Sequence, residues 1–442
     1  MGCFGLQNFS KDLLQNIARQ RISPTVTTFA PLGEALERNA PDTFKIKYSI
    51  PKNSIIGKDH IHHPHIQADP SICKQHARLD QDGQLQDLNS AYGTRVNGTR
   101  INAITQLKKH DVVQFGTGEC YYEFDGKQLL PKQSITLSRE SESQLQAHGK
   151  DFWVSPQHIN LSPDGLLTDL KSTTGTFVDG KKIQGSHQLR NGNIVQLGDL
   201  ESSNYYYSYG KLIPISPKKA RLLRTLFPEG LANCEFKQGQ FGNCTFLASL
   251  KSMIKNNPAK LIEKIEPLPN NRVKLSFPGS HNPTIEMDLS DYKESGVKGP
   301  VGVRLLETAF VRSLQQYSVM DSVAILNEGS LTHEALKALH DGKEPEMLYN
   351  SGKPLIKLDQ SKVLNYLKKI ELNPANHIAV TSTGIDHPEL GIIGQHAYSL
   401  INVDTKNKVV TLSNPHDTTH VMQLSLKDYL NYFRRLTISQ PK

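Results

Sequence analysis

Cys244 combines a reactive side chain with a position that favours its reaction. It follows a turn containing two glycines, and apolar residues then recur with helical spacing until Asn257-Pro258 ends the expected helix. Unpaired N–H groups and the helix dipole at such an N-terminus favour a thiolate over a thiol. Gln238 lies six residues upstream (244 − 238), so the turn can place its amide beside the Cys244 N–H. Together these two donors would stabilise an oxyanion.

A candidate base lies 152 residues further along the chain (396 − 244). His396 opens an expected strand, a polar turn follows near residue 405, and the returning strand ends at Asn414. Folding this hairpin about residue 405 puts His396 opposite Asn414, since 396 + 414 is twice 405. Cross-strand side chains lie about 5 Å apart, so Asn414 would orient the imidazole.

Several motifs in a fixed order resemble those of calpain-type cysteine peptidases, which are relatives of papain. The matching runs are Gln238–Ala248, Leu305–Arg312, Gly394–Ser399 and Asn414-Pro415. The resemblance covers roughly residues 230–420 and implies an α+β papain-like fold. It also implies a role for each residue: Cys244 as nucleophile, His396 as base, Asn414 as its orienting partner and Gln238 in the oxyanion hole.

Three positions depart from the calpain-type pattern. Asn243 stands where the family has Asp before the nucleophile, and Thr245 stands where it has Trp after it. His416 replaces the family's Trp after Asn-Pro, so we expect the hydrogen bond between His396 and Asn414 to lack its aromatic cover.

Peptide hydrolysis of a protein substrate is the expected reaction, and the expected enzyme class is a cysteine endopeptidase. Deamidation or transamidation of a side-chain amide uses the same groups and is an open alternative. The alternative from another class is a catalytically weak or inactive scaffold. No cofactor is expected, no EF-hand loop is found, and calcium dependence is left open. We also expect no metal site, because the His60–His65 cluster lacks a Cys or carboxylate at ligand spacing.

Residues 41–214 contain an internal repeat with an offset of 82. Six pairs of identical residues keep this offset: His76/His158, Asp87/Asp169, Ser90/Ser172, Gly93/Gly175, Gly98/Gly180 and Gly116/Gly198. A constant offset indicates two copies of one module, 41–130 and 131–214. Short alternating strands between Gly, Asn and Asp turns predict that each copy is an all-β sandwich.

Both copies resemble forkhead-associated (FHA) domains, through residues 56–58, 73–77, 87–98 and 112–116 and their counterparts. This resemblance implies recognition of phosphothreonine in a protein partner. The family places an Arg, a Ser and an Asn around the phosphate. The first copy has Lys58, Cys73 and Tyr92 at these positions, so we expect a degenerate site. The second copy keeps Arg139 and Ser155 but has Thr174 in place of the Asn, so we assign phosphopeptide binding to residues 131–214.

The remaining segments complete a multidomain organisation. Residues 1–40 are expected to contain an amphipathic helix, residues 215–229 to form a proline-containing linker, and residues 230–442 to form the peptidase-like domain.

Composition limits the classes of partner and compartment. The formal charge of +8 is spread along the 442 residues without a dense basic stripe, so we expect no nucleic-acid partner. No apolar run is long enough for a transmembrane segment. Five scattered cysteines favour a reducing, cytoplasmic compartment. A further hypothesis is a bacterial effector delivered into a host cell.

Overall fold

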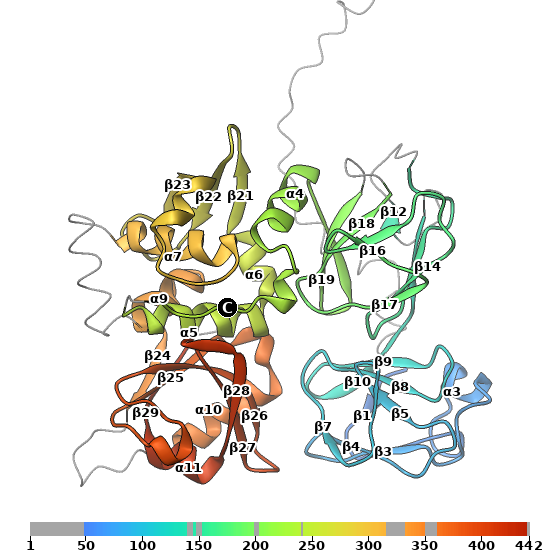
Figure 1. Cartoon of the computed structure of the whole chain (residues 1–442). Coiled ribbons are helices and arrows are strands. Elements are labelled where there is room, and N and C mark those ends of the chain that lie inside the picture. Colours follow the sequence, from blue (N-terminus) through green and yellow to red (C-terminus); the bar gives the residue numbers. More distant parts are fainter. Residues whose placement is uncertain are drawn as a thin grey trace, which may run out of the picture. The chain divides into compact units, whose positions relative to one another are not determined.

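The computed structural model describes residues 48–138, 145–146, 153–198, 203–239, 242–314, 332–349 and 360–439 (Figure 1). The helix expected within residues 1–40 lies outside these ranges, as does Arg139.

The first repeat forms a β-sandwich. In the described residues, one sheet has the strand order β1-β10-β9-β8-β5-β6 and the other β2-β3-β4-β7. Inward-facing side chains of both sheets, such as Ile56, Leu85 and Phe115, are fully buried and form one apolar core. The elements are β1 (Ile50–Pro51), β2 (Ser54–Ile56), α3 (Pro64–Ala68), β3 (Ala77–Leu79), β4 (Gln84–Asp87), β5 (Thr94–Val96), β6 (Thr99–Arg100), β7 (Thr105–Gln106), β8 (Val112–Phe115), β9 (Tyr121–Phe124) and β10 (Gln128–Lys132).

The second repeat forms a sandwich of the same kind, with the described strand orders β12-β11-β13-β14-β17 and β16-β15-β18-β19-β20. Strands β13, β14, β15 and β18 begin and end 82 residues after β3, β4, β5 and β8, which confirms the repeat. The strands are β11 (Ile135–Ser138), β12 (Leu145–Gln146), β13 (Ile159–Leu161), β14 (Leu166–Asp169), β15 (Thr176–Val178), β16 (Lys181–Lys182), β17 (Ser186–Gln188), β18 (Ile194–Leu197), β19 (Asn204–Ser208) and β20 (Lys211–Ile215).

The segment expected as a linker contains a helix instead. Helix α4 (Pro217–Leu226) begins after Ser216, whose hydroxyl accepts a hydrogen bond from the Lys219 N–H at 3.2 Å. Proline is favoured in the first turn of a helix, where its missing N–H costs nothing. The apolar face of α4 is buried, so residues 215–229 are not an open connection.

The C-terminal part contains helices and strands. Its first half comprises η2 (Leu231–Asn233), α5 (Cys244–Asn256), α6 (Pro258–Glu263), β21 (Ile265–Leu268), β22 (Arg272–Ser276), β23 (Thr284–Asp288), η3 (Leu289–Glu294), α7 (Val301–Leu314) and α9 (Thr332–Leu339). Its second half comprises β24 (Glu346–Tyr349), α10 (Gln360–Leu372), η4 (Pro374–Asn376), β25 (Ala379–Thr383), η5 (Pro388–Leu390), β26 (Ala397–Asp404), β27 (Val409–Asn414), β28 (Asp417–Ser425), α11 (Leu426–Tyr432) and β29 (Phe433–Ile438).

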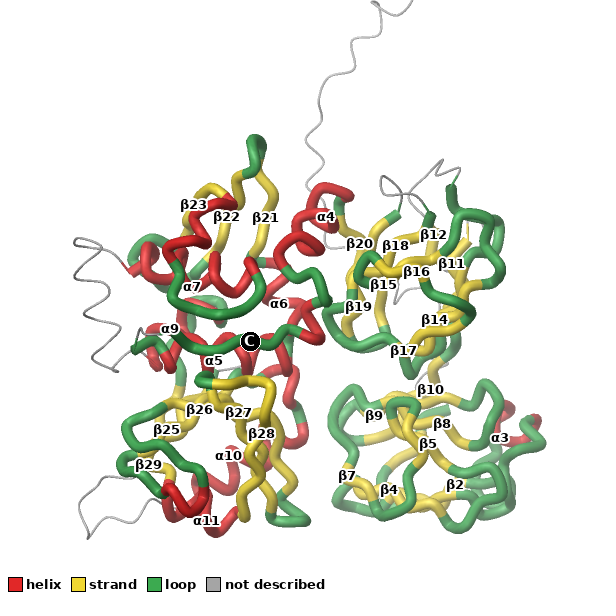
Figure 2. The backbone as a smooth tube through the Cα atoms, viewed as in Figure 1, coloured by secondary structure: helices red, strands yellow, loops and turns green. Residues whose placement is uncertain are grey.

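Helix α5 lies at the centre of this part. Figures 1 and 2 show it between the helices and strands of the first half and the antiparallel sheet β24-β29-β25-β26-β27-β28 of the second. Twelve of its 13 residues are buried. The helix starts at Cys244, as predicted, and ends before Asn257, whose side chain caps α6 by accepting from the Lys260 N–H at 3.2 Å. Such a buried helix holds Cys244 in a fixed position.

Candidate active site and phosphate-binding loops

Helix α5 packs against strand β26, which follows His396. The backbone N–H groups of Ala397, the first residue of β26, and of Thr245 and Cys244 are placed so that they lower the pKa of the Cys244 thiol. The Ser399 hydroxyl fixes the contact between helix and strand by donating to the Ala248 carbonyl of α5 at 2.7 Å. Helix α5, which begins at Cys244, therefore packs against the strand that begins directly after His396.

The protonation of Cys244 differs from our expectation. Burial raises the pKa of the Cys244 thiol above its ordinary value, and the three backbone N–H groups oppose that rise only in part. The cysteine is 8% exposed, so loss of water outweighs the helix N-terminus. The thiol, and not a preformed thiolate, is the resting state in this geometry.

The imidazole of His396 is held by Asn414. Its Nε2 lies 2.8 Å from Asn414 Oδ1, and that oxygen also accepts the His416 N–H at 2.9 Å. Because an amide oxygen can only accept, Nε2 must carry the proton. Nδ1 is then the basic nitrogen, which is the tautomer that a general base requires.

The predicted contact between His396 and Asn414 is present, although the predicted register is wrong. Strands β26 and β27 pair Ser399 with Ser413 and Asp404 with Val409, so the hairpin does not fold about residue 405. The pairing shifts after Ser413, and Asn414 then pairs with Asp417 of β28. This irregularity turns the Asn414 side chain toward His396.

The ring of His416 covers His396, although the sequence predicts no aromatic cover there. Its ring lies on the His396 ring, with the centroids 4.2 Å apart and the planes tilted by 42°. Burial lowers the pKa of His396 to about 4, the Asn414 hydrogen bond opposes this shift, and the charge of His416 adds to it. His416 therefore covers one face of the His396 ring.

The segment containing Gln238 runs beside the segment after Asn414. The Gln238 N–H donates to the Pro415 carbonyl at 2.7 Å, and the Phe236 N–H donates to the Thr418 hydroxyl at 2.8 Å. Lys237 also forms an ion pair with Asp417 at 2.7 Å. These contacts hold the predicted oxyanion residue at the same end of the sheet as Asn414.

Gly239 allows this segment to approach its other neighbour. A Cβ atom at Gly239 would lie 1.8 Å from the Gly296 carbonyl oxygen, so any larger residue would clash with backbone. Two residues away from this contact on each segment, the N–H groups of Lys237 and Lys298 donate to each other's carbonyls at 2.8 and 2.9 Å. The close approach explains one of the two glycines before Cys244.

Glu307 is a residue whose role the sequence did not reveal. It projects from α7 into the interior, is 3% exposed, and accepts hydrogen bonds from the Asn243 amide, the Ser295 hydroxyl and the Val297 N–H. Asn243 precedes Cys244, and Gly296, between Ser295 and Val297, lies against Gly239. One buried carboxylate therefore connects both flanks of the turn before Cys244. A charged residue within the apolar run Leu305–Phe310 was the available signal.

We expect Glu307→Leu to lower the free energy of unfolding by about 2–4 kcal/mol, because three donors would lose their buried acceptor. Chemical denaturation of the whole chain measures this. Glu266, an exposed residue of β21 that pairs with Lys274, provides the control. Glu266→Leu should change the free energy by about 0.5 kcal/mol or less. Equal effects of the two substitutions would contradict the structural role of Glu307.

The two sandwiches share the arrangement of one loop pair. In the second, Ser155 Oγ accepts the Thr173 N–H at 3.0 Å, and in the first, Cys73 Sγ accepts the Ala91 N–H at 3.4 Å. His158 Nδ1 accepts the Ser155 N–H at 3.0 Å, and its Nε2 lies 3.1 Å from the carbonyl oxygen of the glycine at 175. His76 makes the same two contacts, so both histidines hold these loops together.

The predicted phosphate ligands have different environments. The Ser155 hydroxyl accepts from backbone and still has its own proton to donate. The Thr174 hydroxyl instead donates to the Trp153 carbonyl at 2.5 Å, which takes the proton that a phosphate would need. Arg139 lies outside the described residues. Trp153 is 54% exposed and lies beside these loops.

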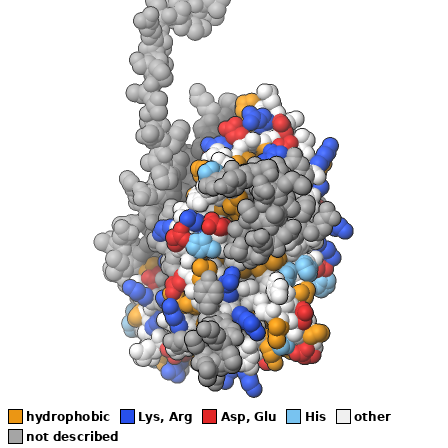
Figure 3. Space-filling view, turned by 90° about the vertical axis from the view of Figure 1, so that its left-hand side faces the viewer, with side chains coloured by type: hydrophobic (Ala, Val, Ile, Leu, Met, Phe, Trp, Pro, Cys, Tyr) orange, Lys and Arg blue, Asp and Glu red, His pale blue; other side chains and the backbone are white. Residues whose placement is uncertain are grey.

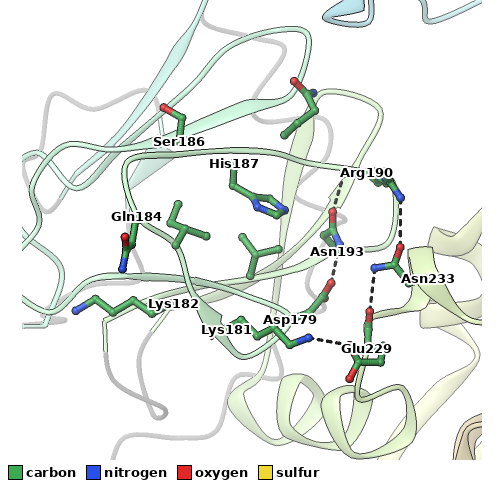
Figure 4. Close-up of a pocket in the computed structure, with 13 residues that line it drawn as sticks. Asp179, Lys181, Lys182, Gln184, Ser186, His187, Arg190, Asn193, Glu229 and Asn233 are labelled. Carbon is green, nitrogen blue, oxygen red and sulfur yellow. Dashed lines mark hydrogen bonds and ion pairs between the residues drawn. The ribbon is translucent and has the colours of Figure 1, made fainter.

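A polar cavity of about 530 Å³ lies along β15, β16 and β17 (Figure 4). Lys181 forms an ion pair with Glu229 at 2.7 Å, and Arg190 donates to Asn233 at 3.2 Å. The cavity does not include Cys244 or the loop at Ser155.

Comparison with known proteins identifies the two sandwiches. The FHA domain family model matches residues 54–116 and 131–198. These two units are FHA domains. No match was found among curated proteins.

Three solved structures are similar to parts of this chain. Mycobacterium tuberculosis EmbR in complex with a low-affinity phosphopeptide is 19% identical, with 18% of this chain and 21% of EmbR covered and a TM-score of 0.16, so the match spans about a fifth of EmbR. A structure from a study of phosphothreonine-dependent FHA domain interactions is 33% identical, with 16% of this chain and 73% of that chain covered and a TM-score of 0.14. The FHA domain of CT664 from Chlamydia trachomatis is 20% identical, with 24% of this chain and 86% of that chain covered and a TM-score of 0.14.

The described residues contain neither a membrane-spanning helix nor a cluster of metal-ligating side chains. None of the helices that the structure describes is long and apolar enough to cross a bilayer. In the same residues, no group of three or more His, Cys, Asp or Glu side chains could hold a metal ion. His63 instead pairs with the Tyr122 hydroxyl at 3.1 Å. On the face in Figure 3, Lys and Arg side chains are interspersed with Asp and Glu.

Proposed function

We propose that this chain is a cysteine peptidase whose FHA domains recruit phosphothreonine-bearing protein partners or substrates. The proposal is supported by two observations: helix α5, which begins at Cys244, packs against strand β26, and His396, the residue before β26, has its tautomer set by Asn414. This arrangement has a nucleophile, a base and a residue that orients the base, as acyl transfer requires.

In the proposed reaction, His396 accepts and returns a proton twice, once in forming the thioester and once in cleaving it. Cys244 Sγ attacks the substrate carbonyl carbon while His396 Nδ1 takes the thiol proton. The oxyanion accepts hydrogen bonds from the Cys244 N–H and the Gln238 amide. The C–N bond then breaks, and His396 gives its proton to the leaving amine. Water, deprotonated by His396, cleaves the thioester and restores the thiol.

The raised pKa of Cys244 and the lowered pKa of His396 keep both side chains neutral in the resting state, so the proposed mechanism does not begin from a thiolate–imidazolium pair. The proton leaves the thiol only as the sulfur attacks, so reactivity depends on a bound electrophile. The same burial favours the second candidate, an inactive scaffold that keeps the fold and presents a binding surface. Deamidation or transamidation would use the identical steps on a side-chain amide.

An electrophilic peptide probe separates these proposals. We expect it to label Cys244 in the wild-type chain and to lose nearly all labelling in Cys244→Ala. The rate should hold as the pH falls to about 5 and decline near pH 4, because His396 with a pKa of about 4 stays neutral, and so basic, above that value. Mass spectrometry locates and times the reaction.

Cys234 provides the matched control. Burial raises its pKa to about 12, and in the described structure its sulfur has no histidine partner. Cys234→Ser should therefore leave labelling unchanged. Equal labelling of Cys244 in wild type and His396→Ala would favour the scaffold.

A further inference from the structure

Both FHA domains place a cation against the same glycine. A Cβ atom at Gly93 would lie 2.5 Å from Arg100 Nε and 2.8 Å from its Cζ. A Cβ atom at Gly175 would lie 2.4 Å from Lys182 Cε and 2.8 Å from its Nζ. Arg100 and Lys182 are themselves 82 residues apart (182 − 100). Both come from the second strand of a hairpin, β6 or β16, and occupy the space that a side chain on the glycine would fill.

These glycines belong to the loops that the Ser position of each domain contacts. Cys73 Sγ touches the Ala91 N–H, and Gly93 follows two residues later. Ser155 Oγ touches the Thr173 N–H in the same way. Two residues of chain span at most about 7 Å. The thiol or hydroxyl and the cation therefore lie against the same short loop.

Both cations are exposed and available to a ligand. No carboxylate forms an ion pair with Arg100 or Lys182 among the described residues. Figure 4 shows the contrast with the preceding residue of β16: Lys181 reaches Glu229, whereas Lys182 points away from that pair. Within the described residues, these two cations therefore have no carboxylate partner that would hold them away from an anionic ligand.

We propose that Arg100 is a phosphate ligand of the first FHA domain and that Lys182 is an additional one in the second. The ligand is a phosphothreonine residue of a protein partner, and this inference rests on the proposed phosphothreonine binding. Arg100 supplies the guanidinium fork that Lys58 cannot provide. The first FHA domain, whose sequence predicts a degenerate site, would then be a second phosphothreonine-binding site, in which Arg100 of β6 is the cationic ligand.

The test is calorimetry on the full chain with a phosphothreonine peptide selected from a degenerate library. We expect two sites per wild-type chain and at least a tenfold loss at one of them in Arg100→Ala, with partial recovery in Arg100→Lys. Arg78, an exposed residue of β3 facing away from the strand's buried neighbours, is the control, and Arg78→Ala should keep both sites. In Arg139→Ala, the remaining binding should disappear when Arg100→Ala is added.

Each contrary outcome has a separate meaning. If Arg139→Ala removes all binding while Arg100→Ala changes nothing, this inference is wrong and the second domain alone binds. If inorganic phosphate occupies the Arg100 site as tightly as the peptide does, the site is a general anion site and the inference also fails. If the wild-type chain does not prefer the phosphorylated peptide to its unphosphorylated twin, the proposed phosphothreonine binding itself is wrong.

Discussion

Cys244→Ala and His396→Ala should each abolish turnover of a protein substrate, by on the order of 10⁴-fold or more. Each change removes a complete chemical role, either the sulfur that forms the thioester or the nitrogen that moves the proton. Their effects should not add in the double variant, because the two residues act in the same step. Rates on a cleaved substrate, with circular dichroism to verify folding, measure this.

Asn414→Ala should be milder, with a loss of about 10²-fold. Asn414 only fixes the tautomer and ring position of His396, and His416 still covers the ring. Wild-type turnover in Cys244→Ala would show that the nucleophile is wrongly assigned. A loss in the Cys234→Ser control as large as in Cys244→Ala would point to a disturbed core.

Arg139→Ala should weaken binding of phosphothreonine peptides to the second FHA domain tenfold to hundredfold. Losing a charge-assisted bidentate contact costs about 1.5–3 kcal/mol. Ser155→Ala should cost less, because it removes one neutral donor. Lys58 belongs to the first FHA domain and has no guanidinium, so Lys58→Ala should leave the phosphopeptide affinity of the second FHA domain unchanged.

The full chain is the appropriate sample for this measurement. Ile194 and Tyr206 of the second FHA domain are buried in the same apolar cluster as helices α4 and α5, so an isolated 131–214 fragment would expose that surface. Titration with a phosphorylated peptide and its unphosphorylated twin gives the comparison. Equal affinities for the two peptides would exclude phosphate recognition by Arg139.

Local sequence patterns predicted much of this structure. The offset of 82 residues located both sandwiches, and short alternating strands predicted their class. The apolar spacing after Cys244 predicted helix α5 from its first residue. The hairpin predicted the contact between His396 and Asn414 correctly but its strand register wrongly, because a side-chain contact tolerates a shift that backbone pairing does not.

The remaining features depend on tertiary contacts that no local pattern encodes. The prolines near residue 217 suggested a linker, yet Ser216 and Pro217 begin a helix whose apolar face is buried by distant parts of the chain. Burial by residues far apart in sequence raises the pKa of Cys244, against the local effect of the helix N-terminus. Glu307 and His416 acquired their roles only through neighbours brought together by folding.

Peptidase activity can be measured by comparing new protein N-termini in cells that express the wild-type chain or Cys244→Ala at equal levels. We expect a set of new N-termini that appears with the wild type, disappears with Cys244→Ala and His396→Ala, and persists with Cys234→Ser. Identical N-termini in wild type and Cys244→Ala would contradict peptidase activity.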